Sequence, residues 1–168
     1  MKSLYVCRHG QSTANLSETY AGHLDTPLTD YGREQARQAA LATDVKFDSI
    51  VSSPLIRAKE TADIIAGQQG YPLDKIIVND LFKERFLGSL QGQPYTIGDE
   101  DELVFTDLEK WADLRARAAQ GLNFLRNLPG DNILLVAHGS LLAAMRMELD
   151  PSASVDELDN AVITRYIP

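Results

Sequence analysis

Two of the three histidines in the chain share one local setting, at the end of an apolar segment and directly before a glycine. His9 follows one such segment with Arg8 beside it, and His138 follows another. Arg57 lies shortly after a third apolar segment. Guanidinium groups and helix N-termini favour phosphate oxygens, and a neutral imidazole can attack phosphorus to form a covalent intermediate. The pattern predicts a phosphoryl site with histidine as the nucleophile.

Several other phosphate, metal and nucleophile motifs do not occur in the sequence. It contains no GxxxxGK[ST] or GxGxxG loop, no HExxH zinc motif and no GxSxG serine motif. We therefore expect no metal ion and no cofactor. A phosphohistidine route needs a proton donor for the leaving oxygen, which is normally a carboxyl group. Glu84 is our candidate for this general acid, and Glu60 is another candidate.

The apolar segments alternate with segments of helical periodicity along the whole chain. We expect strands at 3–7, 48–52, 76–78, 132–137 and about 160–167. We expect helices at 29–42, from Ser53 and Pro54 to about Gly67, at 107–128 and at 140–149. Alternation of this kind predicts an α/β fold with a mainly parallel sheet sandwiched between helices, a three-layer α/β/α arrangement. Ligands bind beyond the carboxyl ends of such strands, so the histidines and Arg57 should meet at one edge.

Length and composition narrow the class of protein. A chain of 168 residues predicts one domain over 1–168, with a short acidic insertion around 94–107. The net charge of −8 argues against nucleic acid as a partner, and the apolar runs are too short for a membrane span. The single cysteine, Cys7, is expected in the core and suggests a reducing, cytoplasmic setting. The composition does not predict an oligomeric state.

The residues around His9 carry a resemblance to a known family. Residues 8–15, Arg-His-Gly-Gln-Ser-Thr-Ala-Asn, resemble the RHGx[ST]xxN signature of the histidine phosphatase superfamily, the phosphoglycerate mutase-like group. Further segments resemble that family in the same order along the chain, namely 25–29 with Gly32, 52–54 with Arg57, 60–62, 84–85 with Gly88 and Gly92, and 136–139. The resemblance extends over nearly the whole chain.

The resemblance assigns a role to each candidate residue. It implies that His9 is phosphorylated and that Glu84 protonates the leaving group and later activates water. It implies that the phosphoryl oxygens are held by Arg8, Arg57 and His138, with help from Asn15 and the N–H of Gly139. We expect a protonated His138, and expect His23 to be solvated. The remaining substrate-binding candidates are Ser12, Gly22 and Arg85.

The resemblance does not reach the features that mark phosphoglycerate mutases. Their Tyr after the catalytic Glu-Arg is replaced by Leu87, their following Lys by Gln93 and Pro94, and their early-loop Thr by Ala21. No Arg-Arg pair occurs. We therefore favour a metal-independent phosphatase acting on a small phosphorylated substrate. The alternatives are a mutase-type phosphotransferase and a phosphate-binding regulator without turnover.

Overall fold

A central sheet carries the residues of interest. The computed structural model describes residues 2–95, 104–154, 156 and 158–167. Within them the sheet has five strands in the order β3-β2-β4-β1-β5. The four strands from β3 to β1 are parallel, and β5 runs antiparallel to β1 at the edge. The strand bounds are β1 Ser3–Arg8, β2 Ser49–Ser52, β3 Ile77–Val78, β4 Asn132–Ala137 and β5 Ile163–Ile167.

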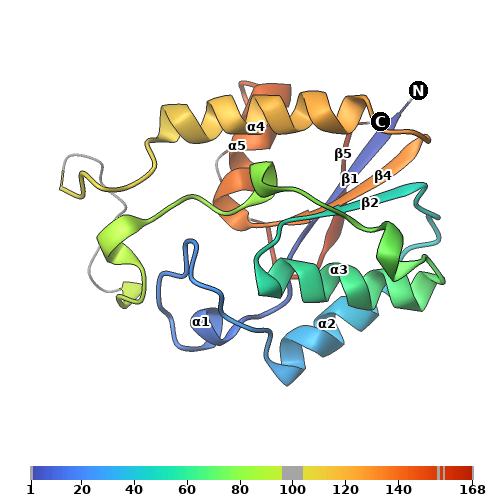
Figure 1. Cartoon of the computed structure of the whole chain (residues 1–168), viewed down its shortest axis with the longest axis horizontal. Helices are drawn as coiled ribbons and strands as arrows, with labels where there is room; N and C mark the ends of the chain where they lie inside the picture. Colours follow the sequence, from blue (N-terminus) through green and yellow to red (C-terminus); the bar gives the residue numbers. More distant parts are fainter. Residues whose placement is uncertain (1, 96–103, 155, 157, 168) are drawn as a thin grey trace.

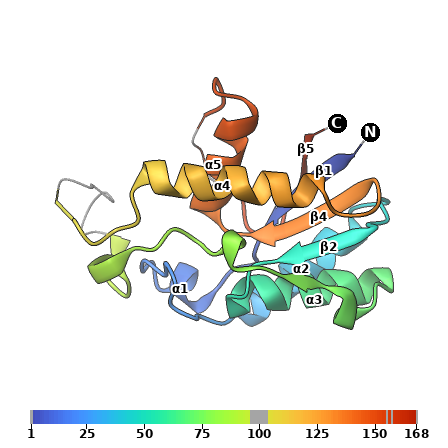
Figure 2. The same ribbon diagram turned by 45° about the horizontal axis from the view of Figure 1, so that its top comes forward.

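Helices cover both faces of the sheet, as Figures 1 and 2 show. Helices α2 and α3 lie on one face, while α4 and α5 lie on the other. The helix bounds are α1 Thr13–Leu16, α2 Asp30–Leu41, α3 Ile56–Gln69, α4 Trp111–Arg126 and α5 Gly139–Leu149. The expected α/β fold, a mostly parallel sheet between helical layers, is confirmed.

Burial on both faces explains why the central strands read as continuous apolar runs. In β4, Ile133 and Leu135 pack with α4 and α5, while Leu134 and Val136 pack with α2 and α3. All four side chains are at most 2% exposed. Because successive side chains point to opposite faces, neither face can accept a polar residue within the strand. Polar residues therefore begin only where the strand ends, at His138.

The helix after β2 begins later than expected. We expected Ser53 and Pro54 to open it, but α3 begins at Ile56. The N–H of Ile56 donates to Oδ1 of Asp25 at 2.6 Å, so a carboxylate from a distant loop replaces the local cap. The helix also passes through Gly67 and ends at Gln69, because Gly70 adopts the left-handed conformation with φ 70°.

Two other boundaries differ from expectation. Helix α4 begins at Trp111 rather than at Asp107, because the Asp107 carboxylate accepts from the N–H of Ser89 at 2.7 Å and from its hydroxyl at 3.0 Å. Strand β5 begins at Ile163, after a turn in which Ala161 has φ 53°. Most of the expected acidic insertion, residues 96–103, lies outside the described residues. No helix within the described ranges is long and apolar enough to cross a membrane.

Candidate active site

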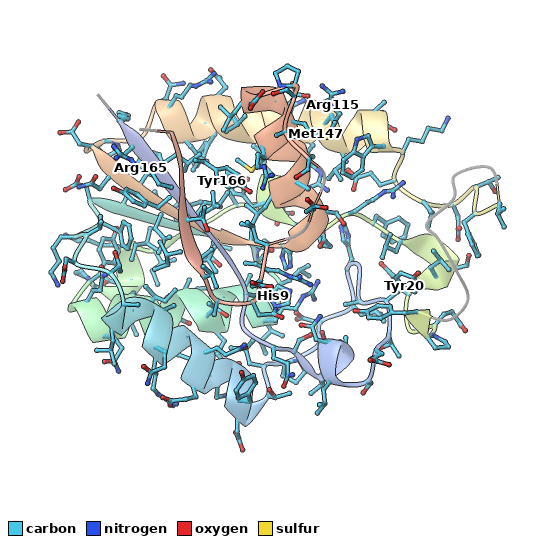
Figure 3. The ribbon with its side chains drawn as sticks, turned by 180° about the vertical axis from the view of Figure 1, so that it is seen from behind. His9, Tyr20, Arg115, Met147, Arg165 and Tyr166 are labelled. Atoms are coloured by element: carbon cyan, nitrogen blue, oxygen red, sulfur yellow. The ribbon has the colours of Figure 1, made fainter. Side chains whose placement is uncertain are left out.

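The carboxyl ends of β1, β2 and β4 meet at one edge of the sheet and bring the two predicted histidines together. His9 follows β1 and His138 follows β4, and their ring centroids lie 5.2 Å apart. Figure 3 shows His9 near this edge and Tyr20 farther out, on the loop that follows α1. A cavity of about 440 Å³ opens here, lined by Arg8, His9, Ser12, Asn15, Glu18, Tyr20, Ala21, Gly22, Arg57, Glu84, Leu87, Tyr95 and Ser140.

The hydrogen bonds of His9 leave its Nε2 unprotonated. Its Nδ1 lies 2.7 Å from the carbonyl oxygen of Gly10, which can only accept, so the proton is on Nδ1. Its Nε2 accepts from Nε of Arg57 at 3.2 Å. Burial, and then the charge of Arg57, lower the pKa of His9 well below its ordinary value. His9 is therefore a neutral imidazole whose Nε2 faces a guanidinium group.

The backbone after His9 is fixed by close contact with α2 and α3. The N–H of Gly10 donates to the Thr61 hydroxyl at 3.0 Å, and that of Gln11 donates to the Gln35 side chain at 2.8 Å. A Cβ atom on Gly10 would overlap the carbonyl oxygen of Gly32, and one on Gly32 would overlap that of Gln11. Both glycines are needed for this approach, which explains why Gly10 and Gly32 belong to the sequence pattern.

Arg57 is the most completely buried cation of the site, with 1% of its surface exposed. Its Nη1 donates to the carbonyl oxygen of Leu24 and its Nη2 to that of Gly22, each at 2.8 Å. Burial lowers the pKa of Arg57, but a guanidinium group stays protonated in proteins. The carbonyls aim this charge at His9. Arg8 also lines the cavity, and its Nη1 donates to the carbonyl oxygen of Leu158 at 3.0 Å.

His138 is fully buried behind the cavity, and one of its ring nitrogens makes no hydrogen bond with the described residues. Its Nε2 lies 2.7 Å from Oγ of Ser53, which also accepts from the N–H of Leu55 at 3.2 Å. The Ser53 hydroxyl can donate to Nε2 or accept from it, and in the first arrangement the His138 proton is on Nδ1. That Nδ1 has no hydrogen-bond partner among the described residues. Burial, followed by the charge of Arg57, lowers the pKa of His138 well below its ordinary value, so the expectation of a protonated His138 was wrong.

Glu84 reaches the same edge from the loop after η2 (Asp80–Phe82). Its Oε1 accepts from the N–H groups of Arg85 at 2.8 Å and Leu141 at 3.1 Å, and its Oε2 accepts from that of Ser140 at 3.2 Å. Ser140 and Leu141 lie in the first turn of α5, where the helix dipole favours a negative group. The side chain is held by main-chain donors, and it lines the cavity with His9.

The other predicted residues fall into two groups. Ser12 and Asn15 line the cavity and form a capping box at α1, and Gly22 lines it beside Arg57. Gly139 opens α5 next to His138. Arg85 lies elsewhere: it is 4% exposed, its Nε donates to the carbonyl oxygen of Glu109 at 2.7 Å, and it stacks over Trp111. The structure thus brings together all the predicted positions except Arg85.

Sequence reasoning missed several residues around the site. His23 was expected to be solvated, but it is half-buried and its Nε2 donates to the carbonyl oxygen of Glu84 at 2.7 Å. Asn160 donates through Nδ2 to the carbonyl oxygen of His9 at 2.8 Å. These contacts span long stretches of chain, and no local pattern signals them. Cys7 is buried as expected, and burial raises the pKa of its thiol to about 12.

Within the described ranges, no three His, Cys, Asp or Glu side chains converge as a metal ion would require.

A family model described as the histidine phosphatase superfamily (branch 1) matches residues 4–165. The chain belongs to this superfamily.

Named relatives and solved structures match nearly the whole chain. One is named uncharacterized phosphatase PhoE from Bacillus subtilis, 33% identical over 98% of this chain and 87% of its own. Another, from Gloeobacter violaceus, is named 2,3-bisphosphoglycerate-dependent phosphoglycerate mutase 2 and is 30% identical over 100% of this chain and 84% of its own. A mycobacterial glucosyl-3-phosphoglycerate phosphatase, solved with VO3, superposes with a TM-score of 0.84 at 27% identity, over 98% of this chain and 92% of its own.

Proposed function

We propose that this protein hydrolyses phosphomonoesters through a phosphohistidine on His9, without a metal ion. The observation that carries the proposal is the unprotonated Nε2 of His9, which faces the guanidinium group of Arg57 in the same polar cavity as the Glu84 carboxyl group. A neutral imidazole next to a fixed cation can attack an anionic phosphoryl group that the cation holds.

The reaction balances with these groups in two steps. In the first, Nε2 of His9 forms a bond to phosphorus while the phosphorus–oxygen bond to the leaving group breaks, and protonated Glu84 gives its proton to that oxygen. In the second, Glu84 takes a proton from water, the water oxygen attacks phosphorus and the nitrogen–phosphorus bond breaks. Inorganic phosphate leaves, and Glu84 is again protonated. The Nδ1 proton of His9 stays on Nδ1 throughout, hydrogen-bonded to the Gly10 carbonyl oxygen.

The buried groups around His9 suit the charge that develops on the phosphoryl oxygens. Arg8 and Arg57 supply two fixed positive charges at the cavity wall. With its proton on Nδ1, a neutral His138 has a buried N–H that can donate to a phosphoryl oxygen, and that nitrogen has no partner among the described residues. A buried donor without a partner costs free energy, so a phosphoryl oxygen at that point would be favoured.

The cavity wall favours a phosphatase over a phosphoglycerate mutase. Apart from Arg8, His9 and Arg57, no described residue that lines the cavity is a Lys, Arg or His, and Glu18 adds a carboxylate there. A substrate carboxylate would therefore meet no second cation and would be repelled by Glu18. The substrate class that fits is a small phosphomonoester without a carboxylate near the phosphate. The mutase remains the second candidate because of the relatives that bear that name.

The first experiment is phosphate release from a panel of phosphomonoesters between about pH 5 and 7, with EDTA present. Wild type is compared with His9→Ala, and trapping of radiolabelled phosphate on His9 is measured in parallel. We expect turnover by the wild type that disappears in a folded His9→Ala variant. Turnover that persists in that variant would contradict the mechanism. Turnover only after a bisphosphorylated primer is added would identify a mutase, and phosphate binding without turnover would identify a regulator.

A further inference from the structure

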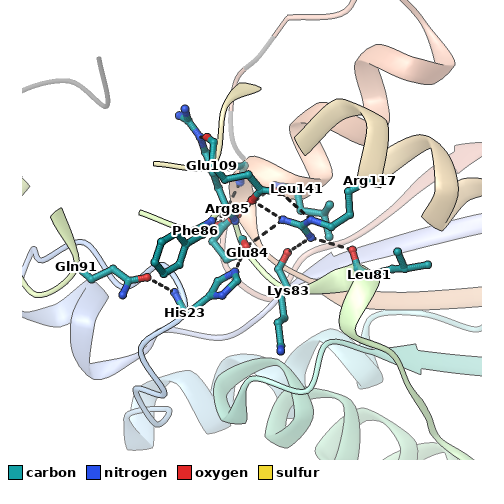
Figure 4. A network of polar contacts seen from close by, with 11 residues as sticks. His23, Leu81, Lys83, Glu84, Arg85, Phe86, Gln91, Glu109, Arg117 and Leu141 are labelled. Carbon is teal, nitrogen blue, oxygen red and sulfur yellow. Dashed lines mark hydrogen bonds and ion pairs between the residues drawn. The ribbon is translucent and has the colours of Figure 1, made fainter. Parts of the chain in front are cut away.

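Arg117 on α4 lies outside the cavity lining, yet its whole guanidinium group is directed at the segment that carries Glu84 (Figure 4). Its Nη1 donates to the carbonyl oxygens of Leu81 at 2.9 Å and Lys83 at 2.6 Å, and its Nη2 donates to that of Glu84 at 3.1 Å. The side chain is only 19% exposed. One side chain thus binds three main-chain acceptors within four residues of chain.

The remaining donors of Arg117 bind Glu109. Nε donates to Oε1 at 2.9 Å and Nη2 to Oε2 at 2.7 Å, so five hydrogen bonds match the five N–H groups of the guanidinium. Burial raises the pKa of Glu109, but the hydrogen bonds from Arg117 and the N–H of Phe86, with the charge of Arg117, outweigh it and lower that pKa. The pair is therefore ionised and geometrically specified.

Glu109 fixes the chain on the far side of Glu84. Its Oε2 accepts from the N–H of Phe86 at 3.0 Å, and its own N–H donates to the carbonyl oxygen of Phe86 at 2.9 Å. Its carbonyl oxygen accepts from Nε of Arg85 at 2.7 Å. Arg117 and Glu109 together therefore hold the backbone before Glu84, at Glu84 and after it.

His23 ties this segment to the loop that orients the Arg57 guanidinium. Its Nε2 donates to the carbonyl oxygen of Glu84, the same atom that accepts from Arg117. Its N–H donates to the Gln91 side chain at 2.8 Å. The neighbouring residue Gly22 holds Arg57 through its carbonyl. The Glu84 backbone thus has one support from α4 and one from this loop.

We infer that Arg117, paired with Glu109, is the positioning residue that sets Glu84 for proton transfer to the leaving oxygen. The inference rests on the proposed function. Within the described residues, the hydrogen bonds to the Glu84 carboxylate all come from main-chain N–H groups, so its position follows from the position of the backbone. Proton transfer needs heavy atoms within hydrogen-bond reach, so a displaced backbone weakens the acid without removing the nucleophile or the phosphate contacts.

A misplaced general acid has a signature that depends on the leaving group. An alkoxide is a poor leaving group and needs its proton in the transition state, whereas p-nitrophenolate leaves with little help. The measurement is kcat/KM, which reports the steps up to phosphoryl transfer and so excludes the later hydrolysis of the phosphohistidine, which is common to all substrates. General structural damage lowers kcat/KM for both substrates alike.

The experiment compares an alkyl phosphate with p-nitrophenyl phosphate in Arg117→Met, Arg117→Lys and Glu109→Gln. We expect Arg117→Met to lower kcat/KM for the alkyl ester by ~10–100-fold and for the aryl ester by no more than ~3-fold, a partial loss of the ~10²–10⁴-fold that general acid catalysis supplies. Lys keeps the charge but cannot make five directed bonds, so Arg117→Lys should lose in the same direction. In a Glu84→Gln background, Arg117→Met should add no further loss that depends on the leaving group.

Arg115→Met is the matched control. Arg115 lies on the same helix and pairs with Glu148 at 2.6 Å, away from the cavity lining. We expect this variant to leave both activities unchanged. Equal losses on the two esters in folded Arg117 and Glu109 variants would overturn the positioning role. A wild type whose turnover does not depend on His9 would instead overturn the proposed function. Should Arg117→Met fail to fold, Arg117→Lys and Glu109→Gln test the same ratio.

Discussion

The cavity has two regions that are built differently. Its floor consists of His9 and Arg57, with His138 buried behind them, and all three are at most 4% exposed and follow strands or open helices of the main layers. Its mouth consists of Glu18, Tyr20 and Tyr95, which lie on loops joined by main-chain hydrogen bonds. Each polar group of the floor has its geometry set by packing, whereas the mouth is partly solvated. The comparison indicates that the floor determines the reaction and the mouth determines which ester is accepted.

Removing a charge from the floor should have the largest effect and tests whether the floor acts equally on all esters. Arg57→Met should lower kcat/KM by at least ~100-fold, and by the same factor for every ester, because the lost charge acts on the phosphoryl group common to all. It also leaves the carbonyls of Gly22 and Leu24 without their donor. Steady-state kinetics over the substrate panel measures the effect. A loss confined to some esters would show that the floor also selects the leaving group.

The burial of the floor should also be visible in the pH dependence of stability. The pKa values of His9 and His138 are lower in the folded protein than the ordinary 6.5. Below pH 6.5 the unfolded chain binds protons that the folded chain does not. The free energy of unfolding is therefore highest above that pH and decreases as the pH falls below it. Each histidine contributes up to about tenfold in the unfolding equilibrium constant per pH unit. Urea unfolding between about pH 7 and 5 measures this slope.

His138→Gln provides the control for that slope. The variant should lose the contribution of one proton, so its stability should fall less steeply with decreasing pH than that of the wild type. A slope equal to that of the wild type would mean that His138 takes up its proton in the folded state, contrary to the effect of its burial.

A charge substitution at the mouth of the cavity should have the smallest effect of these variants. Glu18→Lys should raise kcat/KM for a phosphoglycerate relative to a neutral ester by roughly 3–10-fold, since exposed charges act weakly through solvent. Glu18 has φ 53°, and Lys and Glu tolerate this backbone conformation equally, so the fold should be retained. Asp74→Lys, at an exposed residue of η1 (Leu73–Lys75), changes the net charge equally and should not alter the ratio. An unchanged ratio in Glu18→Lys would remove Glu18 from substrate selection.

The sequence predicted the fold and the meeting of the histidines because both depend on short-range patterns. The ends of strands and the residues after them can be recognised in the sequence, and the parallel arrangement brings these residues to one edge of the sheet. The start of α3 was misplaced because its cap, Asp25, comes from a separate loop. His23 was misjudged for the same reason, since its partner is the carbonyl oxygen of Glu84.

The supports of the site were the hardest part to predict. Arg85 was expected near the substrate because it follows Glu84, yet its side chain turns to Glu109 and Trp111. Arg117 carries no local signal, because an arginine on an amphipathic helix reads as a solvated side chain. Its role depends on a segment more than thirty residues earlier, at residues 81–84. Only the tertiary structure joins such positions.

The contact between Gly10 and Gly32 has a consequence for how this enzyme can be altered. It joins the strand-to-loop turn that bears the nucleophile to α2 through main-chain atoms alone. A single added methyl group at either glycine must push α2 away from β1, which moves His9 without touching any charged residue. In a random mutagenesis library, Gly32→Ala should therefore appear among the inactive clones beside true catalytic substitutions. Substitutions that alter substrate preference should be tolerated better in the loops at the mouth than at the contact between Gly10 and Gly32.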